Sequence, residues 1–158
     1  MSGLIALGVL VQAADIALGW FTAIHDLDNG LVIDENYDGN AGHVLHGFVG
    51  LDVIPALGLI LLVVSFFAAT TVPGARTWAG IVFVLILLQV TLAFIAFGVP
   101  IVGALHGLNA LAVLGAAVRA MMLTRDDGGT RRDSRGGAAD VPRQSTGSSV
   151  PEASRPVN

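Results

Sequence analysis

The sequence contains no cysteine and no lysine. Without cysteine the chain cannot form disulfides, hold iron–sulfur clusters, ligate haem through a thiolate or attach a c-type haem covalently. Only 13% of the residues are charged, and all eight basic residues are arginine. The sequence has no stripe of basic residues of the kind that indicates nucleic-acid binding. The short motifs of nucleophilic hydrolases, kinases and metalloproteases are also missing, so whether the protein is an enzyme stays open.

What the chain has in abundance is apolar sequence, with 54% hydrophobic residues and a mean hydropathy of +0.75. These values are typical of proteins embedded in a lipid bilayer rather than of soluble domains. Four apolar segments each approach the roughly 20 residues that cross a bilayer core. They are Leu4–Ala23, Val44–Ala69, Trp78–Phe97 and Ile101–Leu123. Residues 1–123 are therefore predicted to form an all-α, polytopic membrane four-helix bundle with up-down-up-down topology.

Charges of opposite sign separate along the chain and predict its orientation. The first loop, Ile24–Gly42, holds five acidic residues and no arginine, whereas five arginines lie between Arg119 and Arg135. By the positive-inside rule, both termini are predicted to be cytoplasmic in a bacterial plasma membrane. No positive residue precedes the first apolar segment, which favours a retained helix over a cleaved signal peptide. Residues 124–158, rich in Gly, Ser, Pro, Arg and Asp, are predicted to be a disordered cytoplasmic tail.

Two short stretches in the second and fourth segments resemble each other. LHGFVGLDV, Leu45–Val53, and LHGLNALAV, Leu105–Val113, share five of nine residues, including His46 and His106. Both segments are predicted to run in the same direction, and both histidines lie about 6 to 9 Å from the helix starts. Because alternate helices of such a bundle lie diagonally across its core, the two imidazoles are predicted to face one another.

The first and third segments show a weaker parallel, with Gln12 in LVQAADIALG and Gln89 in LLQVTLAFIAFG. Both parallels together predict a duplicated helical hairpin, whose copies are related by a pseudo-two-fold axis along the membrane normal. Gln12, Gln89, Thr91 and Asn109 are predicted to form hydrogen bonds between helices. Asn109, three residues after His106, is the preferred candidate for holding a histidine in orientation.

A pair of facing imidazoles in an apolar interior suits a metal cofactor. Haem iron accepts one ligand on each side of its ring, so one b-type haem bound by His46 and His106 is predicted. Gly50 and Gly107 are small residues near these ligands that would let a porphyrin approach the helices. His43 lies three residues before His46 on the same face and is the alternative ligand. A zinc or copper site would need further ligands that are not evident.

Asp52 lies about 9 Å along the second segment from His46. An ionised carboxylate at this depth would be costly. Two interpretations stay open for this residue: a hydrogen-bonded structural acid, or an acid in a proton relay or quinone pocket. In the first loop, DENYDG opens like a calcium-binding loop, but Leu45 stands where the bidentate Glu is required. A solvated acidic loop is favoured there.

Several of these stretches together resemble a known family. His46 followed by Gly50, LLQVTLA in the third segment and GALHGLNALAVLG in the fourth look like small bacterial four-helix membrane proteins, of actinobacterial type, whose function is unknown. The resemblance covers about residues 4–123, and GALHGLNAL is its most specific part. More distantly, opposed histidines in a helical bundle resemble b-type membrane cytochromes and the membrane anchor subunits of respiratory complexes. Likeness of fold alone does not establish a function.

The function expected from these features is electron transfer by an integral-membrane protein with one haem near its outer face. Its partners would be the lipid bilayer and either respiratory-complex subunits or a quinone. Two alternatives stay open. The first is a haem-free membrane accessory or assembly protein, and the second is a small proton-coupled transporter using Asp52 and Asp15. The transporter would need the chain to form a homo-oligomer, because four helices make a thin pathway.

Overall fold

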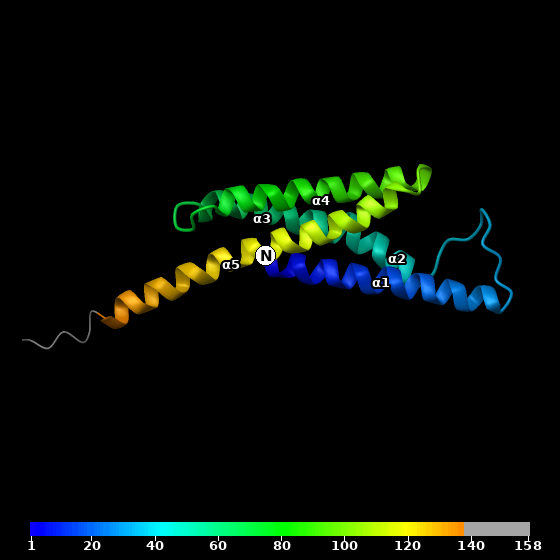
Figure 1. The fold of residues 1–158 in the computed structure, drawn as a ribbon, viewed down its shortest axis with the longest axis horizontal. Helices are drawn as coiled ribbons and strands as arrows, with labels where there is room; N and C mark the ends of the chain where they lie inside the picture. The colour runs from blue at the N-terminus through cyan, green and yellow to red at the C-terminus, as the bar shows by residue number, and fades with distance from the viewer. Residues whose placement is uncertain (138–158) are drawn as a thin grey trace, which may run out of the picture.

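The computed structural model describes residues 1–137, with side chains described through Leu123, and is helical throughout this region apart from its connections. Four helices in it are long and apolar enough to cross a membrane. They are Ser2–Asp28, Ala41–Ala68, Ala75–Gly98 and Val102–Leu123. The predicted all-α membrane bundle of four spans is therefore confirmed, and each observed span overlaps the segment predicted for it (Figure 1).

The first helix, α1 (Ser2–Asp28), is longer than the span predicted from hydropathy. It ends where Gly30 adopts a φ of 97°, a conformation that glycine reaches without steric cost. The backbone N–H of Leu31 donates to the carbonyl oxygen of Asp26, which closes the last turn. The acidic connection predicted to begin at Ile24 therefore begins at Asn29, because polar residues at a membrane surface can continue a helix that hydropathy alone would end.

The second span is interrupted, which hydropathy did not indicate. It consists of α2 (Ala41–Phe48), a π-helical turn η1 (Val49–Val53) and α3 (Ile54–Ala68). Pro55 lies in the first turn of α3 and has no N–H to donate to a carbonyl in the preceding turn. The wider π turn lies directly before this proline, as expected where the regular i→i−4 pattern is broken.

The start of α2 is held by Asn40 and His43 in a reciprocal cap. The Asn40 side-chain oxygen accepts from the N–H groups of Gly42 and His43 at 3.1 and 3.4 Å, and His43 Nδ1 accepts from the Asn40 N–H at 3.4 Å. The Asn40 side-chain amide also donates to the carbonyl of Gly19 at 2.7 Å, which ties α2 to α1. This cap determines where the second span begins.

The remaining helices complete a ring of antiparallel neighbours. Helix α5 (Val102–Gly137) packs against α1 and α4 (Ala75–Gly98), while α3 packs against α4 and α2 against α1. The second span therefore lies diagonally opposite α5, as predicted for up-down-up-down topology. Figure 1 shows the α1–α2 loop and the α4–α5 turn at one end of the bundle, which we call the loop end. The α3–α4 turn lies at the opposite end, the turn end.

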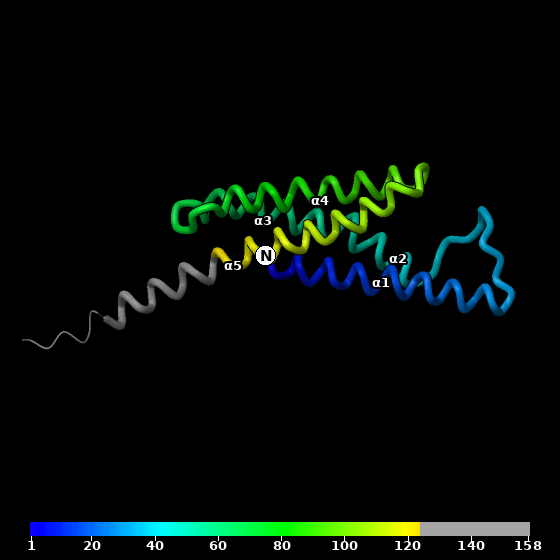
Figure 2. Tube along the Cα trace, in the orientation of Figure 1, coloured from blue at the N-terminus to red at the C-terminus, as the bar shows by residue number. Residues whose placement is uncertain are grey.

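The well-packed apolar core lies toward the turn end. Figure 2 shows the N-terminus beside α5, and a Cβ at Gly3 would lie 3.2 Å from the Met121 sulfur. The fully buried large side chains are Ile5, Val82, Ile86 and Val113. Small alanines of α5, among them Ala116, Ala117 and Ala120, allow the helices to approach closely. The loop-end half is less filled, and the polar residues of the bundle gather there.

Helix α5 extends to Gly137 and so passes the boundary predicted after Leu123. The sequence contains no proline between Pro100 and Pro142 that would end it. The remainder of the predicted tail, residues 138–158, lies outside the described residues, as do all side chains beyond Leu123.

Candidate functional site

His46 and His106 face each other across the interior of the bundle. Their ring centroids are 6.4 Å apart and their planes meet at 61°. His46 lies on α2 and His106 lies on α5, which are diagonally opposed in the bundle. The two residues are far apart in the sequence and meet only in the folded chain. The prediction that these two imidazoles lie opposite one another is confirmed.

Both imidazoles are oriented by the same kind of hydrogen bond. His46 Nδ1 lies 3.0 Å from the carbonyl oxygen of Gln12, and His106 Nδ1 lies 3.0 Å from the carbonyl oxygen of Gln89. A carbonyl oxygen can only accept, so each Nδ1 carries the proton and each Nε2 presents a lone pair. Gln12 and Gln89 were matched by the internal sequence parallel, and they occupy equivalent places in the two hairpins. This correspondence supports the duplicated hairpin.

The second hairpin adds a side-chain network to this arrangement. The Gln89 side-chain amide donates to His106 Nε2 at 3.0 Å, and its oxygen accepts from the Asn109 amide at 2.7 Å. Asn109, which is buried, also donates to the carbonyl of Leu85 at 2.9 Å. Asn109 therefore positions His106 through Gln89 and does not contact the imidazole itself.

The first hairpin lacks this network, because Val49 stands three residues after His46 where Asn109 follows His106. The side-chain amide nitrogen of Gln12 is buried and has no hydrogen-bond partner among the described residues. The interhelical side-chain bond predicted for Gln12 is therefore not formed. The same prediction fails for Thr91, whose hydroxyl donates to the carbonyl of Leu87 in its own helix. The prediction of hydrogen bonds between helices is correct for Gln89 and Asn109.

A cavity of about 810 Å³ surrounds the two imidazoles. This volume lies within the range of ordinary ligand and cofactor pockets, about 300 to 1,000 Å³. Its walls are mostly apolar, and its polar lining groups are Gln12, Gln89, His43, His46, His106 and the Trp20 indole. The cavity is therefore apolar, with a few polar groups converging on it.

Glycines keep space open beside each imidazole. Gly47 and Gly107 directly follow the histidines and line the cavity, and a Cβ at either position would meet no atom within 4 Å. Gly50, one turn after His46, also lines the cavity, and a Cβ there would lie 2.7 Å from the Gln12 side-chain oxygen. Gly50 and Gly107 thus occupy the places predicted for small residues near the ligands.

His43 has a different environment from His46. Its Nδ1 belongs to the cap of α2, and its ring packs edge-on against Trp20 with ring centroids 5.3 Å apart. Tyr37 lies on another side, 6.4 Å away between centroids. His43 lines the cavity toward the loop end, but His46 is the residue opposite His106. The geometry favours His46 of the two candidate ligands.

Asp52 and Asp15 differ in burial. Asp52 is exposed on the outside of the bundle and has no hydrogen-bond partner among the described residues. It does not line the cavity, so the prediction of a buried position is wrong, while its roles as a hydrogen-bonded structural acid or as an acid in a proton relay or quinone pocket stay predictions. The π turn that carries Asp52 was not foreseen. Asp15, by contrast, is only 7% exposed, and one of its carboxyl oxygens has no partner.

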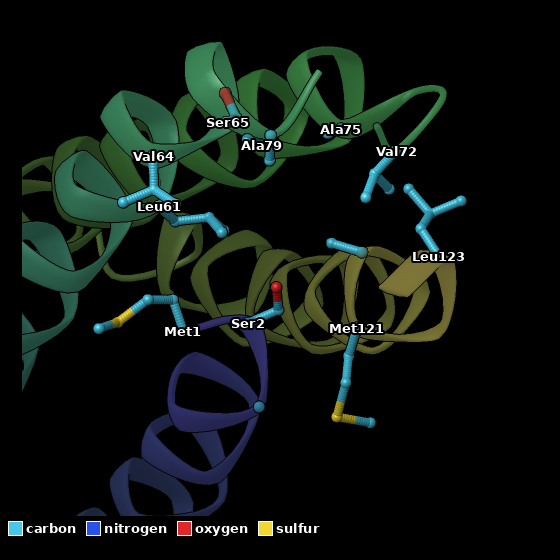
Figure 3. A pocket seen from close by; sticks show the side chains of 13 residues that line it. Met1, Ser2, Leu61, Val64, Ser65, Val72, Ala75, Ala79, Met121 and Leu123 are labelled. Carbon is cyan, nitrogen blue, oxygen red and sulfur yellow. The ribbon is translucent and has the colours of Figure 1, made fainter. Parts of the chain in front are cut away.

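A second cavity, of about 210 Å³, lies at the turn end between the N-terminus, α3, α4 and α5. Figure 3 shows its lining side chains, which are apolar except for Ser2 and Ser65. The Ser65 hydroxyl donates to the carbonyl of Leu62 in its own helix. No imidazole, carboxyl or guanidinium side chain lines this cavity, so the loop-end cavity is the candidate site.

Within residues 1–123, no three or more His, Cys, Asp or Glu side chains are grouped to hold a metal ion. A structural zinc site uses four protein ligands, so this part of the chain does not provide one. Two opposed imidazoles meet a different requirement, because a macrocycle supplies the other ligands of its iron.

Comparison of the chain with protein-family models, with curated proteins and with solved structures finds no match. The geometry of the site is therefore the basis on which a function can be inferred.

Proposed function

We propose that this protein is an integral-membrane b-type haem protein in which His46 and His106 ligate one haem b. Its role would be electron transfer in a bacterial plasma membrane, as a small cytochrome or as a subunit of a respiratory assembly. The observation that carries the proposal is the pair of Nε2 lone pairs on facing imidazoles, each oriented by an Nδ1–H bond to a backbone carbonyl. Such a bond to the far nitrogen is the usual support of a metal-ligating histidine.

The separation of the rings suits a shared metal. Metal–imidazole bonds are about 2 Å long, so two imidazoles that hold the same metal would have ring centres roughly 6 Å apart. The observed separation of ring centroids is 6.4 Å. Gly47 and Gly107 leave open space beside the rings, and the cavity of about 810 Å³ supplies the room that a porphyrin needs. The residues present therefore fit the group.

Haem binding would require one side chain, that of Gln89, to move. The Gln89 side-chain amide donates to His106 Nε2 and has to turn away before that nitrogen can bind iron. The His106 Nδ1–H bond to the Gln89 carbonyl is a backbone contact and stays in place. The Gln12 side-chain amide makes no such bond to His46 Nε2, so that nitrogen is already accessible.

Haem iron that alternates between its ferric and ferrous states carries one electron at a time. The chain's own residues orient the two imidazoles and line the cavity around them with mostly apolar side chains. Because the core occupies the turn-end half, His46 and His106 would hold a haem near the loop end, where it would supply one-electron chemistry on that side of the bundle. The arginine distribution favours the loop end as the outer face, with both termini cytoplasmic. A respiratory subunit or a quinone is the partner that this chemistry fits.

A haem-free accessory or assembly protein is the second candidate. The bonds among Gln89, His106 and Asn109 favour it, since together they satisfy one hairpin's polar groups without any cofactor. The proton-coupled transporter has less support, because neither Asp15 nor Asp52 lines the cavity.

Absorption spectra separate these functions. The protein is purified in mild detergent from haem-supplemented cells, and oxidised and dithionite-reduced spectra are recorded for wild type, His46→Ala and His106→Ala. A six-coordinate low-spin b-type spectrum that both substitutions abolish is expected. His25→Ala is the matched control, because His25 lies outside the cavity near the end of α1. His43→Ala should keep the low-spin spectrum if His46 is the ligand. A colourless wild-type protein at full haem supply overturns the proposal.

A further inference from the structure

Asp52 is a polar residue of the spans that the haem site does not use. It lies in η1, eleven residues after Ala41 in the span Ala41–Ala68, or about 16 Å along the helix and near the middle of the bilayer. Its side chain is exposed on the outer surface of the bundle, where lipid would surround a single copy. No hydrogen bond or ion pair within residues 1–123 satisfies it. Carboxyl groups at this depth are costly and normally face a partner.

The local backbone also distinguishes this position. Asp52 is carried by the single π-helical turn within residues 1–137, and such turns occur frequently at functional sites. One turn to either side, Phe48 and Ala56 are exposed as well. Asp52 is thus the polar centre of an otherwise apolar, outward-facing strip of the second span. We call the strip formed by Phe48, Asp52 and Ala56 the Asp52 face.

Both arginines whose side chains are described, Arg76 and Arg119, are engaged elsewhere in the bundle. Arg76 and Arg119 lie toward the turn end and stack on Phe66 and Trp78, with 5.3 and 5.6 Å to the ring centroids. The complementary group is a second Asp52, because a protonated carboxyl both donates and accepts. Across a two-fold axis, two such groups can satisfy each other with a pair of O–H···O bonds. Small Ala56 lets the two helices approach closely.

We propose that two copies of this chain associate in the membrane through the Asp52 face, with the two Asp52 carboxyls hydrogen-bonded to each other across a two-fold axis. The interface is isologous, so the same surface serves both copies. It lies on the outside of the second span and away from the cavity, so this dimer and the haem site are independent properties.

The chain contains no cysteine, so disulfide cross-linking can be done without background in native membranes. Phe48→Cys and Ala56→Cys are introduced singly on the Asp52 face. Leu108→Cys is the matched control, because Leu108 is 63% exposed on α5, the helix diagonally opposite the second span. Mild oxidation is expected to give a covalent dimer at positions 48 and 56 and little at position 108. Absence of dimer at both positions, equal dimer at all three, or a product with the mass of a different protein overturns the proposal.

The role of the carboxyl is tested in the Ala56→Cys background. Asp52→Asn keeps a group that donates and accepts, and the cross-linked fraction should be retained. Asp52→Leu removes the hydrogen bonds without disturbing the fold, because the side chain is exposed to lipid, and should weaken self-association about tenfold. Unchanged dimer in Asp52→Leu overturns the proposal. Thr91→Val is the control for polarity, since Thr91 is also exposed but bonds within its own helix. None of these measurements requires haem.

Discussion

Replacement of Gly107 by leucine tests whether the loop-end cavity holds the proposed haem. A Cβ at Gly107 meets no atom within 4 Å, and Gly107 lines the cavity beside His106. A leucine there projects into space that is open in the structure, so the helix should form at least as well as before. Leucine is a better helix former than glycine by up to about 1 kcal/mol, which opposes any loss of stability.

The same side chain should interfere with a porphyrin in the cavity. Forcing extra volume into an occupied site typically costs about 1 to 3 kcal/mol, because side chains must leave their preferred rotamers. Since about 1.4 kcal/mol corresponds to a tenfold change in affinity, Gly107→Leu should bind haem roughly 5- to 150-fold more weakly. Gly107→Ala, which adds a single methyl group, should show a smaller effect in the same direction.

Gly115→Leu provides the matched control. Gly115 is on the same helix, and a Cβ there also meets nothing within 4 Å, but it does not line the cavity. Haem titration of the purified proteins, followed by absorbance, gives the affinities, and circular dichroism confirms equal helix content. If Gly107→Leu binds haem within about twofold of Gly115→Leu, the cavity is not the haem site and the reasoning is wrong.

Two further predictions concern the supports of the site. Asn109→Leu removes the hydrogen bonds to Gln89 and to a backbone carbonyl. Because such bonds contribute about 0.6 kcal/mol each in membrane proteins, the substitution should lower the unfolding free energy by about 1 kcal/mol. An unchanged thermal midpoint in detergent contradicts this. Gly42→Ala should destabilise the bundle by more than Gly47→Ala, because its Cβ would lie 2.6 Å from the backbone oxygen of Asp15, whereas Gly47 faces open space. Equal thermal midpoints for these two variants would show that α1 and α2 tolerate separation.

Much of the membrane architecture was predictable because it depends on composition within short windows. Long apolar runs with few charges predicted the four spans, since unpaired backbone groups cannot remain in lipid and a helix satisfies them locally. The meeting of His46 and His106 was also predictable, through the repeated LHG stretches and the diagonal relation of alternate helices. The hydrogen bonds from the two imidazoles to the backbone carbonyls of Gln12 and Gln89 were not predictable, because backbone acceptors leave no signal in sequence.

Other features depended on neighbours that a single segment does not reveal. Asp52 was expected in the interior, but it lies in the π turn before Pro55 and is exposed on the outer surface. His43 was the alternative to His46 as a ligand in sequence, yet it takes part with Asn40 in the cap of α2. Gln12 and Gln89 looked equivalent, yet the Gln89 amide bonds to both His106 and Asn109, whereas the Gln12 amide nitrogen has no partner among the described residues.

The sequence by itself determined that this chain enters a membrane with four helices and places one histidine on each of two alternate spans. These properties follow from hydropathy and periodicity, which act within one segment at a time. The tertiary structure decided which nitrogen of each histidine is exposed, how far apart the rings lie and which polar groups lack partners. Those properties depend on contacts between helices far apart in sequence, where a difference of one side chain decides whether a hydrogen bond forms.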